Sequence, residues 1–423
     1  MSLHNEFPST LHINEFGPLH QVDIAIPDIL VLNGAQTSGK STLAKCLHYF
    51  KSLPQTLLLL LLEAAREKRR LSDRDVVVAC RRRLMHFFGT TKHFSDFRLR
   101  YAYDRDVWIE ITRESSSGHA RVVLSPSVKN GLLDASDLLQ MKAGTSGFLD
   151  YQAEWNERRV AAQEALQGLF RESRTPVFIP AGRSLVATLS GELRRLDPSN
   201  LDTLTKEFIE RIHFHRPEYA HSLQELVEDR KRLSSSLIDV DQAQKAIHLI
   251  EMILHGSYRF ENGEERIVYD AVQGRYVKFE FASSGQQEVL WILLLVFQLI
   301  IGDRPTCCVI EEPEAHLFPD TQYDLVRLLA LFASSPDHQL VITTHSPYVL
   351  AAMNLSLLAW QVPSQHEFSG LSPARVQACF LRDGKLDDIL DEETGLIDPA
   401  YLDQVSGPIN EAFDRLLQAR DQK

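Results

Sequence analysis

The sequence predicts an α/β fold in which a mixed sheet is flanked by helices and interrupted by a mostly helical insertion. Residues 29–32 form a continuous apolar run that ends in a glycine-rich loop and leads into a helical pattern, as a central parallel strand does. Residues 290–343 alternate between helical and strand-like patterns. Between these parts lie long stretches that are rich in Ala, Leu, Glu and Gln, which favour helices. At 423 residues the chain can form one large domain with an insertion, or two domains.

The order of the elements follows from the period of the apolar residues and from the turn residues between them. Helices are expected at 41–88 with a break at Pro54, and at 134–171, 201–255, 290–301 and 321–332. Strands are expected at 11–14, 22–26, 29–32, 97–103, 107–112, 120–124, 177–179, 258–260, 267–269, 277–281, 307–310 and 340–343. We therefore divide the chain into residues 1–128 and 257–423, the two halves of an α/β head, and residues 129–256, the helical insertion.

Charge and composition exclude several classes of protein. The formal net charge of −12 and the pI near 5.7 argue against a surface built as a whole for nucleic acid, although they allow a local basic patch. Five cysteines without metal-ligand spacing predict buried thiols in a reducing cytoplasm. The N-terminus lacks the pattern of a signal peptide. The apolar run at 57–62 is far shorter than the ~20 residues of a membrane span, so it predicts the inner face of a buried helix.

A phosphate-binding loop follows the apolar run at 29–32. The loop matches G-x-x-x-x-G-K-[ST] and lies between a strand and a helix, where this motif functions. Its glycines let successive N–H groups face the phosphates, and the helix N-terminus adds partial positive charge. Lys40 is expected on the β- and γ-phosphates and the Ser41 hydroxyl on Mg²⁺. The residues predicted to bind the nucleotide are Gly34, Gln36, Thr37, Ser38, Gly39, Lys40, Ser41 and Thr42.

Paired carboxylates end the strand predicted at 307–310. A phosphate-transferring enzyme needs one acid in the Mg²⁺ shell and another that orients or deprotonates the attacking water. We assign Glu311 to the metal and Glu312 to the water. The pair by itself would also fit an acidic loop after a core strand, so the interpretation depends on the motifs around it.

Two further motifs flank these acids. Ser284, Gly285 and Gln286 open an apolar helix, and such an N-terminus can bind an anion without a lysine. His345 ends the strand predicted at 340–343, which is expected beside the strands of the phosphate loop and of the acids. From that position the imidazole can reach the γ-phosphate. The predicted catalytic residues are therefore Lys40, Glu312 and His345.

In this order, the phosphate loop, the serine–glycine signature, the acidic strand and the strand-end histidine resemble the head of ABC-type ATPases. The similarity is greatest to the group of RecF, SMC and OLD proteins, whose AAA-type relatives carry Glu-Glu-Pro-Glu-x-His-Leu and then Thr-Thr-His-Ser, here residues 311–317 and 343–346. The resemblance covers both halves of the head and leaves the insertion without a named match. It implies a P-loop fold of the ABC type, ATP and Mg²⁺ as cofactors, and hydrolysis of ATP.

The resemblance also implies partners. ABC-type heads pair head to tail on ATP, so we expect a homodimer or higher homo-oligomer in which Ser284 of one chain completes the Lys40 site of the other. Stand-alone ATPases of this group, without a Toprim nuclease, are often encoded with a separate effector, a nuclease or a toxin, in bacterial anti-phage defence. The chain after His345 is short for a Toprim domain, which favours a stand-alone ATPase.

Alternatives remain at the level of function and of single segments. A RecF/SMC-like DNA-binding ATPase in DNA repair or maintenance is the alternative function, whereas a transporter ATPase fits the large insertion and the acidic strand poorly. The basic stretch from Arg66 to Lys92 suits nucleic-acid phosphates or the solvated faces of helices. Arg183 suits contact with the nucleotide or with a neighbouring subunit, or a structural role at a strand end. The acidic residues at 387–398 suit a metal site or a solvated loop.

The sequence departs from the common pattern at three positions, one of which is Glu311, where Asp is more widespread. Gln36 stands in the phosphate loop where Asn is usual, and Phe318 stands where transporter heads place an aspartate at the dimer contact. Gln140 is a candidate for the glutamine that such heads place near the metal.

Overall fold

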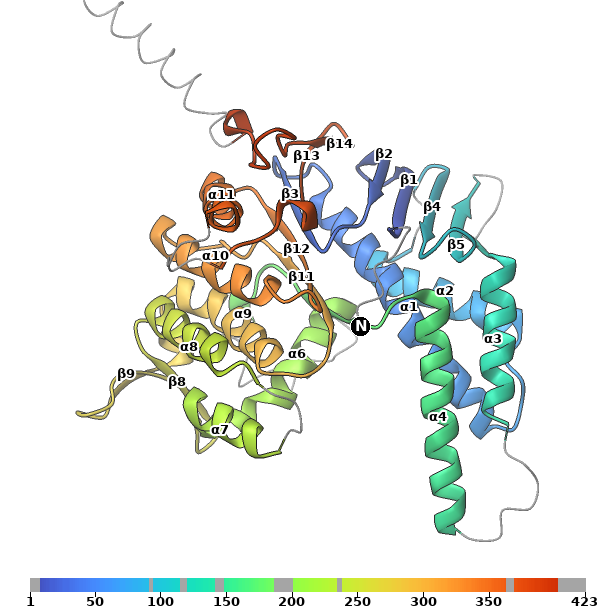
Figure 1. The fold of residues 1–423 in the computed structure, drawn as a ribbon, viewed down its shortest axis with the longest axis horizontal. Coiled ribbons are helices and arrows are strands. Elements are labelled where there is room, and N and C mark those ends of the chain that lie inside the picture. Colours follow the sequence, from blue (N-terminus) through green and yellow to red (C-terminus); the bar gives the residue numbers. More distant parts are fainter. Residues whose placement is uncertain are drawn as a thin grey trace, which may run out of the picture.

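A mixed sheet runs through the middle of the molecule and carries helices on both faces (Figure 1). The computed structural model describes residues 8–90, 94–114, 120–140, 148–185, 201–233, 238–362 and 369–401. Within these residues the main sheet has eleven strands in the order β6-β5-β4-β1-β2-β14-β13-β3-β12-β11-β7. They are β1 Thr10–Phe16, β2 Leu19–Ala25, β3 Ile29–Gly34, β4 Phe97–Ala102, β5 Trp108–Arg113, β6 Arg121–Leu124, β7 Thr175–Ile179, β11 Thr306–Glu311, β12 Gln339–Thr344, β13 Val376–Arg382 and β14 Lys385–Asp388.

The sheet changes character along its width. From β13 through β3, β12 and β11 to β7, neighbouring strands are parallel, whereas β6, β5, β4, β1 and β2 pair antiparallel. A separate antiparallel sheet contains β8 Ser257–Glu261, β9 Glu264–Asp270 and β10 Arg275–Lys278. The fold class predicted from the sequence, a mixed sheet flanked by helices, is confirmed.

The helices described are α1 Lys40–Arg66, α2 Asp73–Phe88, α3 Pro126–Leu138, α4 Phe148–Phe170, α6 Thr203–His215, α7 Leu223–Leu233, α8 Val240–Leu254, α9 Ser284–Ile300, α10 Pro319–Ala333 and α11 Pro347–Gln361. Short 3₁₀ turns occur at η3 Arg216–Ala220, η4 Phe279–Phe281, η5 Pro373–Arg375 and η6 Pro399–Tyr401.

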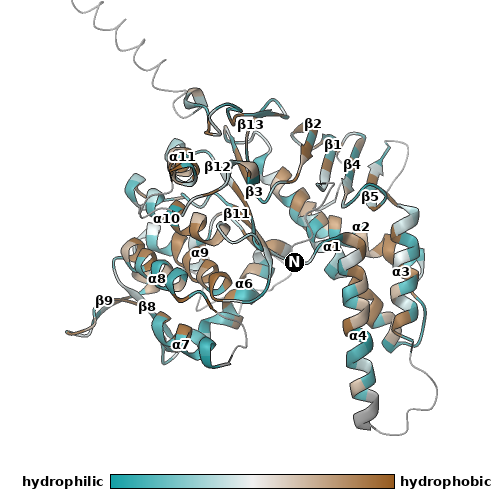
Figure 2. Cartoon of the chain, viewed as in Figure 1, coloured by the Kyte–Doolittle hydropathy of each residue, from teal (hydrophilic) through white to brown (hydrophobic). Residues whose placement is uncertain are grey.

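The two faces of the sheet carry separate cores because side chains alternate along each strand. On β3, Ile29 and Val31 belong to the core with α6, α8, α9, α10 and α11, whereas Leu30 and Leu32 belong to the core with α1, α2, α3 and α4. Covering on both faces explains the continuous apolar run in the sequence. Figure 2 shows the contrast between buried α9, mainly brown, and α7, mainly teal.

Helix α1 continues through Pro54, where the sequence suggested a break. A proline has no backbone N–H, so the carbonyl four residues earlier loses its helical partner. That carbonyl belongs to Phe50, and here it accepts a hydrogen bond from the Tyr103 hydroxyl at 2.6 Å. The predicted break was wrong because a side chain distant in sequence replaces the missing donor. The gap between helices falls later, after Arg66.

The range 129–256 does not form a separate helical unit. Helix α3 begins at Pro126, and both α3 and α4 pack against α1, whereas α8 packs against α9 and α10 on the other side of the sheet. Between them in sequence, β7 pairs in parallel with β11 as the last strand of the main sheet. It joins the sheet because Val177 and Ile179 complete one core and Phe178 the other. Part of the expected insertion therefore belongs to the head.

Several expectations about surface and core can be compared with the structure. All five cysteines are buried and unpaired, as predicted. In the apolar run at 57–62, Leu57 and Leu61 are buried while Leu59 is exposed, which confirms an inner helix face. In the part of the chain that the structure describes, no helix is long and apolar enough to cross a bilayer, and no three candidate metal ligands of His, Cys, Asp or Glu type cluster together.

Candidate active site

Parallel strands β3, β12, β11 and β7 end at one edge of the sheet, and the predicted site residues follow them. β12 lies between β3 and β11, and β7 lies on the far side of β11. The phosphate loop after β3, His345 after β12, and Glu311 with Glu312 at the end of β11 therefore share this edge. In open α/β sheets, ligands bind at the carboxyl ends of the strands. The neighbourhood expected for the histidine strand is confirmed.

The phosphate loop depends on two glycines. Gly34 has φ 149°, and a Cβ there would lie 2.6 Å from the carbonyl oxygen of Leu381. Gly39 has φ 109°, and a Cβ there would lie 2.6 Å from Cδ2 of Leu19. Gly39 is also the N-cap of α1 and supplies no side-chain cap, so the N–H groups of the first helical turn remain available to an anion.

Lys40 lies over its own loop. The side chain is buried, and Nζ donates hydrogen bonds to the carbonyl oxygens of Gly34 at 2.7 Å and Ala35 at 2.8 Å. Burial lowers the pKa of Lys40, while the charges of Glu312 and Glu314 oppose that change and favour the ammonium. A buried cation that is bonded only to carbonyls beside a helix N-terminus can exchange those contacts for phosphate oxygens.

Glu311 is the buried carboxylate of the pair. Its Oε2 accepts a hydrogen bond from the Ala181 N–H at 3.4 Å, and among the residues described its buried Oε1 has no hydrogen-bond partner. Burial raises the pKa of Glu311, although Lys45, the Ser41 hydroxyl and the Ala181 N–H favour the carboxylate. The two predicted Mg²⁺ ligands, Ser41 and Glu311, are thus neighbours across the loop and the acidic strand.

Glu312 has an unusual backbone and an open side chain. Its φ is 42°, in the left-handed region that non-glycine residues seldom adopt. Its N–H donates to the carbonyl oxygen of Thr343 on β12 at 2.9 Å. The side chain is 32% exposed, and its Oε1 lies 3.7 Å from Nδ1 of His345, which is 54% exposed. This arrangement leaves a carboxylate and an imidazole facing the edge where phosphates would lie.

Glu314 belongs to the same site, although the sequence motifs predicted no role for it. It is 4% exposed, and its Oε1 accepts hydrogen bonds from the Thr344 hydroxyl at 2.6 Å and the His345 N–H at 3.0 Å. The same oxygen lies 3.5 Å from Nδ1 of His345. Glu314 therefore orients the histidine. The signal was present in the third acid of Glu-Glu-Pro-Glu, three residues after Glu311.

The serine–glycine signature begins helix α9. Ser283 is the N-cap, and it forms a capping box with Gln286, whose side-chain amide also donates to the carbonyl oxygen of Leu254 at 2.8 Å. Ser284 is consequently the first helical residue, and it is exposed. A Cβ on Gly285 would lie 3.0 Å from the carbonyl oxygen of His316, so this glycine lets α9 approach the loop after the acids. Because its side chain already caps α9, the nucleotide contact of Gln286 stays a prediction.

Other candidates have different places in the structure. Gln140 lies just after α3, where its amide donates to Asp137. Phe318 is the N-cap of α10 and is 75% exposed. Arg183 is buried, with 1% of its surface exposed. In the basic stretch, three arginines bind carboxylates: Arg69, Arg70 and Arg83. Lys92 lies outside the described residues.

The polar groups at this edge fit ATP and Mg²⁺. Ser38 Oγ and Glu311 Oε1 are buried atoms without a hydrogen-bond partner among the described residues, which a bound ligand would satisfy. Mg²⁺ prefers oxygen ligands such as those of Ser41 and Glu311. The N–H groups at the N-terminus of α1 suit phosphate oxygens, and so does the ammonium group of Lys40. The residues predicted for the cofactors therefore form one coherent set.

Comparison with known protein families indicates the class of protein to which part of the chain is similar. Residues 188–350 match the AAA ATPase domain family (AAA_15), a span that contains the signature, the acidic strand and the strand-end histidine but not the phosphate loop. This match shows that residues 188–350 are similar to AAA ATPase domains, and the motifs assembled on parallel strands agree with the predicted resemblance to ATPase heads of the ABC type. The ATPase class predicted from the motifs is confirmed. No curated protein matches the chain in sequence.

Solved structures include distant likenesses to two kinds of head. The SMC head domain from Thermotoga maritima is 13% identical, with a TM-score of 0.38, over 90% of this chain and 97% of that one. An SMC head bound to the C-terminal winged-helix domain of ScpA is 12% identical, with a TM-score of 0.43, over 92% and 100%. The recombination mediator RecF is 11% identical, with a TM-score of 0.35, over 91% and 100%.

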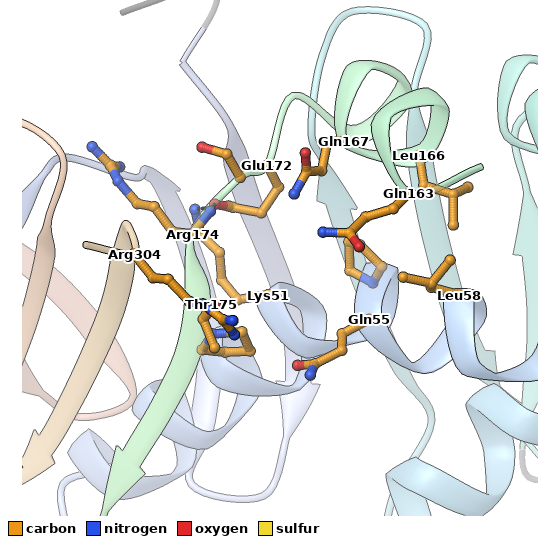
Figure 3. Close-up of a pocket in the computed structure, with 13 residues that line it drawn as sticks. Lys51, Gln55, Leu58, Gln163, Leu166, Gln167, Glu172, Arg174, Thr175 and Arg304 are labelled. Atoms are coloured by element: carbon orange, nitrogen blue, oxygen red, sulfur yellow. Dashed lines mark hydrogen bonds and ion pairs between the residues drawn. The ribbon is translucent and has the colours of Figure 1, made fainter. Parts of the chain in front are cut away.

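A cavity of about 250 Å³ lies away from this site, between α1 and the segment that joins α4 to β7. Figure 3 shows Lys51, Glu172, Arg174 and Arg304 among the side chains that line it. None of the predicted site residues lines this cavity.

Proposed function

We propose that the chain hydrolyses ATP at composite sites formed by two copies arranged head to tail. One observation carries the proposal. Lys40, Glu312 and His345 meet at one sheet edge, while a second anion-binding helix end, at Ser284, is exposed. Among the described residues, no hydrogen bond or ion pair joins Ser284 to the phosphate loop of its own chain. An exposed helix N-terminus without an anion of its own suits the nucleotide of a second copy.

Each residue has a distinct task in this proposal. Lys40 and the first N–H groups of α1 bind the β- and γ-phosphates. Ser41 and Glu311 would hold Mg²⁺, which supplies positive charge to the phosphates when bound. Glu312 orients water and accepts its proton, since its carboxylate is open to solvent. His345, held by Glu314, donates a hydrogen bond to a phosphate oxygen.

Complementation between two damaged chains tests the shared site. Ser284→Arg places a large cation where the partner's phosphate would enter, and should abolish hydrolysis while one chain still binds ATP. Lys40→Ala should abolish hydrolysis by removing the cation on the phosphates. In a mixed dimer, one site contains both lesions and the other contains neither, so mixing should restore up to about half the activity per mixed dimer if the sites act independently.

The outcomes separate the proposal from its rivals. Restored hydrolysis in the mixture, measured as phosphate release, supports head-to-tail sites. A mixture that stays inactive although mixed dimers form contradicts a signature that acts in trans. Full activity of Ser284→Arg alone would show that Ser283 and Ser284 merely cap a helix.

The proposal extends to a partner. ATP-driven pairing of the heads would control a separate effector protein, a nuclease or toxin, in bacterial anti-phage defence and in the cytoplasm, as the resemblance of the motifs implies. Affinity capture of the wild-type chain and of Lys40→Ala from the native host tests this extension. A single protein retained by the wild type in an ATP-dependent manner supports it, whereas DNA as the only ATP-dependent companion favours the RecF/SMC-like alternative.

A further inference from the structure

Arg183 is a fully buried cation, and each of its three guanidinium nitrogens donates to at least one backbone carbonyl oxygen. It follows β7, and its guanidinium contacts the backbone of Glu311 and Glu312. Nη1 donates to the carbonyl oxygens of Pro180 at 2.7 Å and Glu311 at 2.8 Å. Nη2 donates to the carbonyl oxygen of Glu312 at 2.9 Å. The two carbonyls of the acidic pair are therefore held by one planar group.

The other side of Arg183 is joined to the signature helix. Nε donates to the carbonyl oxygen of Glu288 at 2.9 Å, and Nε also lies 3.4 Å from the carboxylate of that residue. This carboxylate accepts the backbone N–H groups of Arg183 and Ser184, each at 3.0 Å. Glu288 is 1% exposed and stands one turn after Ser284 on α9. A rigid network of charged hydrogen bonds thus links the first turns of α9 to the loop after β7.

The hydrogen-bond network around Arg183 helps to hold the backbone conformation of Glu312. Its positive φ is unfavourable for a residue with a side chain, so the surroundings must hold it. Its N–H donates to the carbonyl oxygen of Thr343, and its carbonyl oxygen accepts from Nη2 of Arg183 at 2.9 Å and from the N–H of Ala315 at 3.1 Å. Without the bond from Arg183, the Glu312 carbonyl keeps, among the described residues, only the short-range bond from Ala315, so the peptide and the carboxylate are held less firmly.

We infer that Arg183 is a positioning residue that holds Glu312 in its strained conformation and fastens it to the signature helix of the same chain. The inference rests on the proposed function, in which Ser284 serves the partner's nucleotide and Glu312 serves the chain's own. Through Arg183, a movement of α9 is passed to Glu312. The two ATP sites of the dimer are therefore coupled through the interior of each chain. A phosphate that engages Ser284 at one site aligns the carboxylate at the other.

A lysine at this position is the decisive change. Arg183→Lys keeps the charge but offers one nitrogen, which cannot serve three separated elements as the planar fork does. Arg216→Lys is the matched control. Arg216 is also nearly buried, but it pairs with Glu265 at 3.2 Å and lies over Trp291 of α9.

The test uses the mixed dimer of Ser284→Arg and Lys40→Ala chains, which contains one intact site. Arg183→Lys is placed either in the Ser284→Arg chain, which supplies Glu312 to that site, or in the Lys40→Ala chain, which supplies only Ser284. We expect kcat to fall about tenfold or more in the first arrangement and by a smaller factor in the second, with the KM for ATP unchanged, since a displaced catalytic group costs up to ~100-fold. Arg216→Lys in the first arrangement should leave kcat unchanged.

Each result decides the inference. An unchanged kcat in the first arrangement overturns the positioning role, and a loss confined to that arrangement overturns the link to α9. An equal loss with Arg216→Lys would show a general effect on packing and also overturns it. If Arg183→Lys does not fold, Glu288→Gln, which removes one carboxylate acceptor and keeps the guanidinium, is expected to reproduce the pattern. Failure of the unmodified chain to hydrolyse ATP would instead overturn the proposed function, and the inference with it.

Discussion

Breaking the buried ion pair between Lys51 and Glu172 should destabilise the fold far more than replacing both partners. Lys51 lies in α1 and Glu172 follows α4, and Nζ is 2.5 Å from Oε2 (Figure 3). The side chains are 5% and 8% exposed. Burial by itself would lower the pKa of Lys51, but the charge of Glu172, the hydrogen bond to it and the nearby Tyr101 and Cys307 together outweigh burial and raise the pKa. Glu172 also accepts the Arg174 N–H at 3.1 Å, so it holds the entry to β7.

The expected magnitude follows from the burial of both groups. Glu172→Gln keeps the shape of the side chain but leaves the ammonium of Lys51 buried without a counter-charge, which costs about 3–5 kcal/mol of unfolding free energy. Lys51→Met with Glu172→Leu removes both charges, and buried pairs replaced in this way are often neutral or more stable. Because the pKa of Lys51 is raised, the pair contributes fully below the unfolded pKa of ~10.4 and is lost only as the pH rises through the folded value.

Urea unfolding followed by circular dichroism at pH 7 measures these differences. The exposed pair of Lys245 and Asp241, 61% and 78% exposed, is the control, and Asp241→Asn should leave the midpoint unchanged. A loss below about 1 kcal/mol for Glu172→Gln, or a double variant as unstable as the single one, would refute the reasoning from burial.

Three further changes should have defined effects. Lys40→Ala should weaken ATP binding in calorimetry by about 10²–10⁴-fold, since it removes about two charge-assisted hydrogen bonds worth ~1.5–3 kcal/mol each. Glu312→Gln should keep ATP binding, lower hydrolysis about 10²–10⁴-fold and trap dimers visible by size exclusion, because an amide cannot accept the proton of water. Burial lowers the pKa of His338 to about 4, so the unfolded chain binds a proton between roughly pH 6.5 and 4 that the folded chain does not. Stability should therefore fall by up to about 3 kcal/mol as the pH drops through that window, and His338→Phe should lose less.

Clear results would contradict each expectation. Unchanged ATP affinity of Lys40→Ala would end the interpretation of residues 34–41 as a phosphate loop. Hydrolysis by Glu312→Gln at the wild-type rate would move the catalytic carboxylate elsewhere. Equal losses for the wild type and His338→Phe between pH 7 and pH 5 would show that other groups cause the acid sensitivity.

Local patterns in the sequence were sufficient to predict the candidate site because its motifs are short and self-contained. The loop at 34–41 needs only its own glycines and the adjacent helix, so the strand, turn and helix are readable without tertiary knowledge. The order of the acidic strand and the histidine strand was also sufficient to expect them side by side, since parallel strands bring their carboxyl ends to one edge. Glu314 was missed because its task, holding His345, depends on two strands meeting.

Other features depend on contacts between residues that are distant in sequence. The break expected at Pro54 was wrong because Tyr103, on a different element, supplies the donor that proline lacks. The sequence did not predict that β7 joins the main sheet. The strand pairs with β11, which lies far along the chain, so no local pattern indicates the pairing.

The sequence by itself determined the class of fold, the phosphate loop and the candidate catalytic residues, because period, glycine positions and strand-end residues are local. Only the tertiary structure decided what Arg183 does. A lone arginine after a strand suits a ligand, a partner or a structural role, and its true contacts are carbonyl oxygens of residues more than a hundred positions away. The choice arises from burial: once the guanidinium is removed from water, its donors must find acceptors, and only the folded chain places those of α9 and β11 around it.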